Sequence, residues 1–185
     1  MKIKIMSDQN SQSNKARVMN LLGAALVGLP LSIMAVDTEA VSSNDRTFLK
    51  EAYDDGLAEV QLAELAKTKA TNAEVKKLAE HMEVEHRKAN AELKMLAGSK
   101  KVELPSTPAS AAMSRQKQLE RKEGADFDKA FVDLAISEHK TTIKEFEKVA
   151  KDTKDADVKA FAERTLPSLR AHLSRSEATQ KSVGR

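Results

Sequence analysis

Residues 71–96 carry the pattern that most limits how this chain can fold. Positions that suit a helix core recur there at alternating intervals of three and four, which predicts a helix of about seven turns with one continuous buried row. The row consists of Val75, Ala79, Met82, His86, Ala89, Leu93 and Leu96. A histidine therefore stands in the middle of a row where leucine or alanine would bury no polar atom.

Three other segments have the same spacing, and they predict helices at about residues 46–69, 126–151 and 156–179. The composition agrees, because 32% charged and 3% aromatic residues are typical of long amphipathic helices. The sequence thus predicts an all-α domain in which four long helices bury their apolar rows against one another.

The first and second pairs of predicted helices are related by a shift of 83 residues. Under this shift Phe48 aligns with Phe131, and residues 73–76 align with residues 156–159. One register is kept across two helices and a turn, which indicates a duplicated helical hairpin and a four-helix bundle with approximate two-fold symmetry.

The connection between the two pairs contains a stretch rich in glycine, proline and serine, followed by a short extra helix predicted at about residues 109–122. This central connection is long enough to run the length of the bundle. It could equally stay at one end, and the sequence leaves both arrangements open.

The N-terminal segment differs from the rest of the chain. A basic stretch precedes an uncharged, strongly apolar run at residues 21–36, as in a secretory signal peptide. The run contains Gly28 and Pro30 and is short for a membrane span. We expect export to the periplasm or cell envelope, with cleavage near residue 35 or residue 40. An uncleaved N-terminal membrane anchor is the alternative.

The domain organisation follows from these boundaries. We expect a signal peptide at residues 1–35, a spacer at 36–45, the bundle domain at 46–179 and a short tail at 180–185. The N-terminal signal or anchor is the one part for which we expect contact with a membrane.

Composition and motifs exclude several classes of function. The chain has no cysteine, which rules out disulfides, thiolate metal sites and thiol catalysis. The net charge of +3 comes from the N-terminal segment, so the remainder is neutral and nothing predicts binding to nucleic acid. There is no glycine-rich phosphate loop and no recognisable nucleophile–base pair, so we identify no small-molecule substrate and do not expect an enzyme.

Five polar residues are candidates for a metal site in the bundle core. Glu83 and His86 form a Glu-x-x-His motif, which bundle proteins use to direct two metal ligands inward. Glu59, His139 and His172 occupy the buried rows of the other three helices, whereas His81 falls on a polar face.

Glutamate in the first helix, Glu-x-x-His in the second and a duplicated hairpin together resemble the ferritin-like bundles. The segment from about residue 46 to residue 176 resembles more closely the domain-of-unknown-function family 4142, whose members are often described as exported or outer-membrane proteins. The resemblance is carried by Phe48-Leu49, Ala58-Glu59-Val60, Val75-Lys76, His86, Gly124, Phe127-Asp128, His139, Val158-Lys159, Thr165-Leu166-Pro167 and His172. It implies a ferritin-like fold and export, and no established activity.

A complete di-iron site would need the same ligands in both halves. Under the 83-residue shift, Glu59 aligns with Thr142, Glu83 with Leu166 and His86 with Leu169, so the second half lacks these ligands. A carboxylate-rich, oxygen-activating site is therefore not expected.

The ligands that remain suit Zn²⁺, Cu²⁺ or Fe²⁺ in a degenerate Glu/His site. The alternative is a structural or stress-related envelope protein without catalytic activity. In that case the buried Glu/His cluster would only stabilise the bundle.

Overall fold

The computed structural model describes residues 41–184, and the predicted signal peptide and the first half of the spacer lie outside this range. Within it the chain forms five helices: α1 (Ser43–Lys69), α2 (Ala73–Ser99), α3 (Ser110–Glu120), α4 (Gly124–Asp152) and α5 (Ala156–Val183). No strand occurs in residues 41–184, so the predicted all-α class is confirmed. None of the described helices combines the length and apolar character that crossing a membrane requires.

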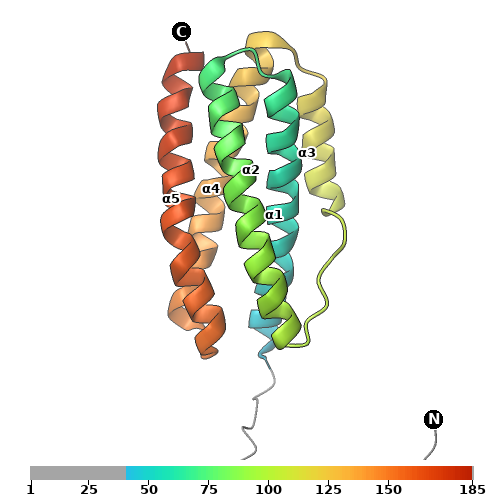
Figure 1. Ribbon diagram of the computed structural model, residues 1–185, viewed down its shortest axis with the longest axis vertical. Coiled ribbons are helices and arrows are strands. Elements are labelled where there is room, and N and C mark those ends of the chain that lie inside the picture. Colours follow the sequence, from blue (N-terminus) through green and yellow to red (C-terminus); the bar gives the residue numbers. More distant parts are fainter. Residues whose placement is uncertain (1–40, 185) are drawn as a thin grey trace, which may run out of the picture. The chain divides into compact units, whose positions relative to one another are not determined.

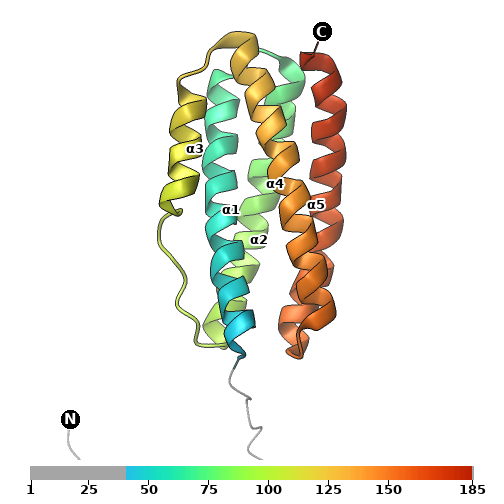
Figure 2. The same ribbon diagram turned by 180° about the vertical axis from the view of Figure 1, so that it is seen from behind.

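The four long helices lie side by side around a shared core (Figure 1). Around the core, α1 is followed by α2, then α5, then α4, and each helix runs antiparallel to both of its neighbours. The short α3 lies outside this group, against α1 and α4 (Figure 2).

The connection from α2 to α4 runs back along the outside of the bundle. It leaves the lower end of α2 in Figure 1, continues as α3, and reaches the upper end of the bundle, where α4 begins. Of the two paths that the sequence left open, the chain therefore takes the one along the length of the bundle.

The core consists of two apolar clusters with a polar layer between them. One cluster lies toward the α1–α2 turn and includes Leu62, Met82 and Phe131. The other lies toward the opposite end and includes Leu49, Leu93, Ile143 and Leu169. In each of the four long helices one buried ionisable residue falls between the two clusters, namely Glu59, His86, His139 and His172.

Side-chain caps determine where three of the helices begin. Asn72 accepts a hydrogen bond from Glu74 N, and Asp155 accepts from Asp157 N and Val158 N. The cap of α1 is Ser42, whose hydroxyl accepts from Asp45 N. Since Ser42 stops the first turn from fraying, α1 starts at Ser43, earlier than the predicted residue 46.

The far end of α5 also differs from the prediction. Residues 180–183 were expected in the tail, but α5 continues to Val183. The Gln180 side chain donates a hydrogen bond to Asp133 of α4, which ties this last turn to the bundle.

Asp128 joins the α1–α2 turn to α4. Its carboxylate is buried and accepts hydrogen bonds from Thr71 N, Thr71 Oγ1 and Asn72 N, at 3.0, 2.6 and 2.8 Å. The backbone N–H groups of a tight turn have no helical partner, so one side chain of α4 satisfies them and fixes the turn against that helix.

We expect Asp128→Ala to lower the free energy of unfolding by about 2–3 kcal/mol, because it removes the charged acceptor of three part-buried hydrogen bonds. Urea unfolding followed by circular dichroism would measure the change. Asp126→Asn, at an exposed position of the same helix, should cost less than about 1 kcal/mol. Equal stability of Asp128→Ala and the wild-type protein would show that the turn does not depend on this carboxylate.

Candidate metal centre

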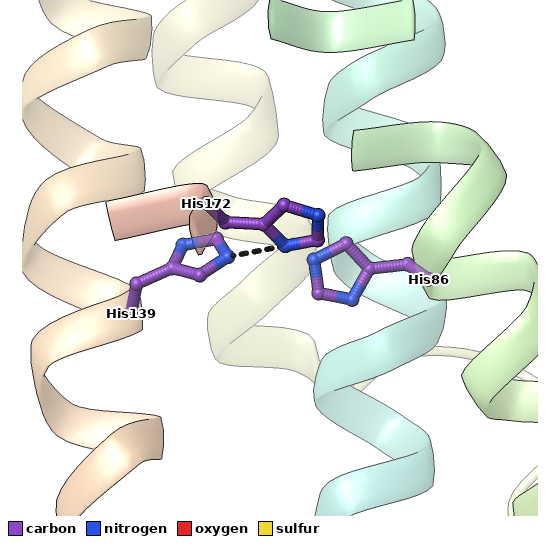
Figure 3. Close-up of side chains that lie close together, drawn as sticks. All are labelled: His86, His139 and His172. Atoms are coloured by element: carbon purple, nitrogen blue, oxygen red, sulfur yellow. Dashed lines mark hydrogen bonds between the residues drawn. The ribbon is translucent and has the colours of Figure 1, made fainter. Parts of the chain in front are cut away.

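Three histidines from three helices converge in the polar layer of the core. Figure 3 shows His86 extending from α2 toward His139 of α4 and His172 of α5. Their exposed fractions are 8%, 1% and 1%, and one ring nitrogen from each lies within 4.8 Å of the other two. The sequence placed these residues on buried rows, and the structure brings them together.

The ring of His139 is held on both sides. Its Nδ1 lies 2.8 Å from the carbonyl oxygen of Ala135, to which it donates, and its Nε2 lies 3.2 Å from His172 Nδ1. A neutral imidazole has one donor and one acceptor nitrogen, so His139 Nε2 accepts the proton that His172 Nδ1 offers. His172 Nε2 then carries a lone pair.

That lone pair and one nitrogen of His86 have no hydrogen-bond partner. His172 Nε2 and His86 Nε2 are both buried and unpaired within residues 41–184. The His86 ring centroid lies 5.0 Å from that of His172 and 5.5 Å from that of His139. Unpaired buried polar atoms are rare because each costs free energy, and two at one place call for an explanation.

Burial keeps the three imidazoles neutral. It lowers the pKa of His86 well below its usual value, and the other two histidines act in the same direction. Burial also lowers the pKa of His139, and it lowers the pKa of His172 to about 3. At neutral pH the three rings therefore carry lone pairs and no charge.

Glu59 lies beside the histidines and is also buried. Its Oε1 is 3.8 Å from His139 Nδ1, too far for a hydrogen bond. Burial raises the pKa of Glu59 well above its usual value, and the charge and hydrogen bond of Glu138 raise it further. Glu59 is thus a neighbour of the three-histidine group, on the side of α1.

Glu83 does not join the group, although the Glu-x-x-His motif suggested that it would. Its carboxylate accepts hydrogen bonds from Lys67 and from Arg87 Nε. The residue lies to one side of the buried row of α2, where two basic side chains can reach it, and these contacts lower its pKa. The grouping of Glu83 with the core histidines therefore needs correction.

The structure adds a contact that the sequence did not suggest. The ring of His81 packs edge-on against His172 with 5.5 Å between centroids, so this half-buried side chain covers the outer side of the cluster. His81 directly precedes Met82 of the buried row, and the sequence pattern places it on the polar face. Nothing in that pattern signals that α5 comes close enough to cover it.

A small cavity of about 40 Å³ adjoins the histidines. Its polar lining comes from all four long helices and includes Glu59, His86, Asn90, His139, Thr142 and Thr165. A larger groove between α2 and α5, of about 300 Å³, reaches His86 and His172 from outside. The histidine cluster is therefore buried but has space beside it.

The lowered histidine pKa values predict how stability depends on pH. Unfolded histidine binds a proton near pH 6.5, whereas these rings in the folded protein do not, so stability is lost as pH falls below about 6.5. Glu59, with its raised pKa, has the opposite effect and partly offsets the loss.

Because of that offset, the test compares the metal-free wild-type protein with His172→Leu, using urea unfolding with a chelator present. Between pH 6 and pH 5 the wild-type protein should lose about 1 kcal/mol more than the variant. If the free energy of unfolding fell equally with pH in both proteins, His172 would take up a proton as readily in the folded protein as in the unfolded one.

Two solved structures resemble this chain in fold. One is "CopM in the Cu(I)-bound form", with a TM-score of 0.63, 18% identity, and coverage of 75% of this chain and 96% of that one. The other is "CopM in the Cu(II)-bound form", with a TM-score of 0.64, 17% identity and the same coverage. At these identities the similarity concerns the fold.

No curated protein matches the sequence. The model of one family, described as "Domain of unknown function (DUF4142)", matches residues 31–179, and this range includes all four long helices almost to the end of α5. The chain belongs to the DUF4142 family.

Proposed function

We propose that this protein binds one transition-metal ion through His86, His139 and His172, with copper as the first candidate. The observation that carries the proposal is the convergence of three buried, neutral imidazoles from three helices, with nitrogens within 4.8 Å of one another. Neutral imidazole is the form that binds metals, so no proton has to be removed from a charged ring before the ion enters.

The distances require only a small adjustment for metal binding. Metal–imidazole bonds are about 2.0 Å long, so two nitrogens on one ion lie about 3.3–4 Å apart. His139 Nε2 and His172 Nδ1 are already 3.2 Å apart. A metal ion at this point would bind both nitrogens once the His172 proton moves from Nδ1 to Nε2, and a rotation of the His86 ring would bring in the third nitrogen.

The surroundings of His139 support the same role. The hydrogen bond from His139 Nδ1 to Ala135 O fixes the ring and leaves Nε2 as the ligand atom. Metal-binding histidines usually have such a partner for the other ring nitrogen.

The choice of metal follows from the donor set and from the fold. Three imidazoles without a thiolate suit copper and zinc. The two similar solved structures hold copper, in the Cu(I) and Cu(II) forms. This supports copper over zinc as the first metal to test.

The proposal includes a ferritin-like origin by duplication of a hairpin. The antiparallel pairs α1–α2 and α4–α5, joined by a long outer connection, support it, since ferritin-like bundles have one such crossover. Under the 83-residue shift, His139 and His172 align with Gly56 and Ala89, which line the cavity. The cavity would then lie where an ancestral, symmetric bundle had side chains equivalent to His139 and His172.

We further propose that the protein is exported and acts in the periplasm or cell envelope without catalysing a reaction. The basic and apolar N-terminal segment supports export. A cell-envelope protein that holds a metal ion needs no substrate site, in agreement with the lack of a nucleophile–base pair in the sequence.

A purely structural cluster is the competing function. The hydrogen bonds of His139 to Ala135 and His172 favour it, because they would fix the register of α4 and α5. This function leaves His86 Nε2 without a partner, whereas metal binding would make that nitrogen a ligand.

Copper binding to the full chain, produced without a histidine tag, should show one ion per molecule by elemental analysis and calorimetry. His86→Ala and His172→Ala should each weaken binding about 100-fold or more, since two imidazoles then remain. His81→Gln removes a histidine outside the three-ligand group and should change the affinity less than about threefold. Glu83→Gln should also have no effect, because its carboxylate faces Lys67 and Arg87.

The two functions give different results with His86→Ala. Lower stability of the metal-free protein with unchanged copper content would favour the structural cluster. Equal loss of copper binding in His81→Gln and His86→Ala would show that copper binding is not confined to the three-histidine group and would contradict the proposed ligand set.

A further inference from the structure

The small cavity beside the histidines has the position and lining of a ligand pocket. It is lined by two of the three proposed ligands, His86 and His139, and it lies on their α1 side, between the helices. Polar side chains from α1, α2, α4 and α5 border it, including the carboxyl groups of Asp55 and Glu59, and apolar residues complete the lining.

Gly56 and Asn90 form one wall of this cavity. A Cβ atom on residue 56 would lie 2.0 Å from Asn90 Oδ1, so the Asn90 amide occupies the space that the glycine leaves. Asn90 is half-buried, and within residues 41–184 its amide makes no hydrogen bond to another protein group, although it can make four. Its free hydrogen-bonding capacity lies next to the cavity.

The hydroxyl groups on the opposite side add acceptors. Thr165 Oγ1 donates to Phe161 O at 2.8 Å, so its lone pairs remain available. Thr142 is one turn from His139 on α4 and also lines the cavity. The volume of about 40 Å³ exceeds the roughly 10–15 Å³ needed for one water molecule and has room for a ligand of two or three atoms.

We propose that a metal ion bound by the three histidines keeps an open coordination position that faces this cavity. The position takes a water molecule, or a small anion of two or three atoms that displaces the water. The Asn90 amide can donate to either group, and Thr165 Oγ1 can accept from the water. This inference rests on the proposed metal site. Three-ligand sites commonly fill the fourth position with water, whereas closed structural sites use a fourth side chain.

The test uses azide as the small anion and the full chain loaded with one equivalent of Cu²⁺. Azide should produce a saturable azide-to-copper charge-transfer band and change the electron paramagnetic resonance spectrum, while the bound copper measured after gel filtration stays constant. Ala89→Leu fills the cavity, because Ala89 lines it one turn beyond His86, and should weaken azide binding at least tenfold. Ala91→Leu adds the same side chain at an exposed position of α2 and should leave azide binding unchanged.

The outcomes separate the pocket from the metal site. Stoichiometric copper binding without any spectral response to azide would overturn the open position and leave the metal site intact. Failure to bind copper in the core would overturn both. If Ala89→Leu does not fold, Asn90→Leu replaces it, and an unchanged azide affinity in the folded variant would show that the anion does not occupy this cavity.

Discussion

Burial of imidazole between two apolar half-cores is the constraint on which the rest of this structure depends. Apolar packing alone would place leucine or alanine at His86, His139 and His172, as it does one or two turns away on each helix. The three rings satisfy only part of one another's hydrogen-bonding capacity. The polar layer therefore contributes less to the free energy of unfolding than the apolar clusters do. A metal ion bound there would increase that free energy.

The three histidines lie at one level only if α2, α4 and α5 keep their register along the bundle axis, and contacts far from the histidines fix that register. A slip of one helical turn would move a ring by about 5.4 Å, more than the 4.8 Å over which the three nitrogens now meet. Asp128 fixes the α1–α2 turn against α4, and Lys100 bridges Asp155 and Asp157 at the opposite end. These polar contacts at both ends hold the register in which the histidines of α2, α4 and α5 lie at one level.

The periodic rows were enough to predict the helices and the burial of Glu59 and all three core histidines, because burial on a long amphipathic helix follows directly from spacing. Spacing alone does not show whether a residue at the edge of a buried row points into the core or toward solvent. Glu83 is three residues from His86, yet Lys67 and Arg87 hold it outside the cluster. His81 is covered by α5, and the cavity depends on how Asn90 packs over Gly56. These features depend on the distances between helices, which a single sequence does not encode in any local pattern.

The outer path of α3 has a consequence for the order of assembly. Because the crossover leaves α1–α2 and α4–α5 as two local hairpins, each can form from contacts close in sequence before the two meet. His86 belongs to the first hairpin, and His139 and His172 to the second. A half-formed chain thus offers at most two of the three imidazoles. If the triad binds a metal ion as proposed, a newly made chain would gain full affinity for that ion only after the two hairpins have docked, at the last step of folding.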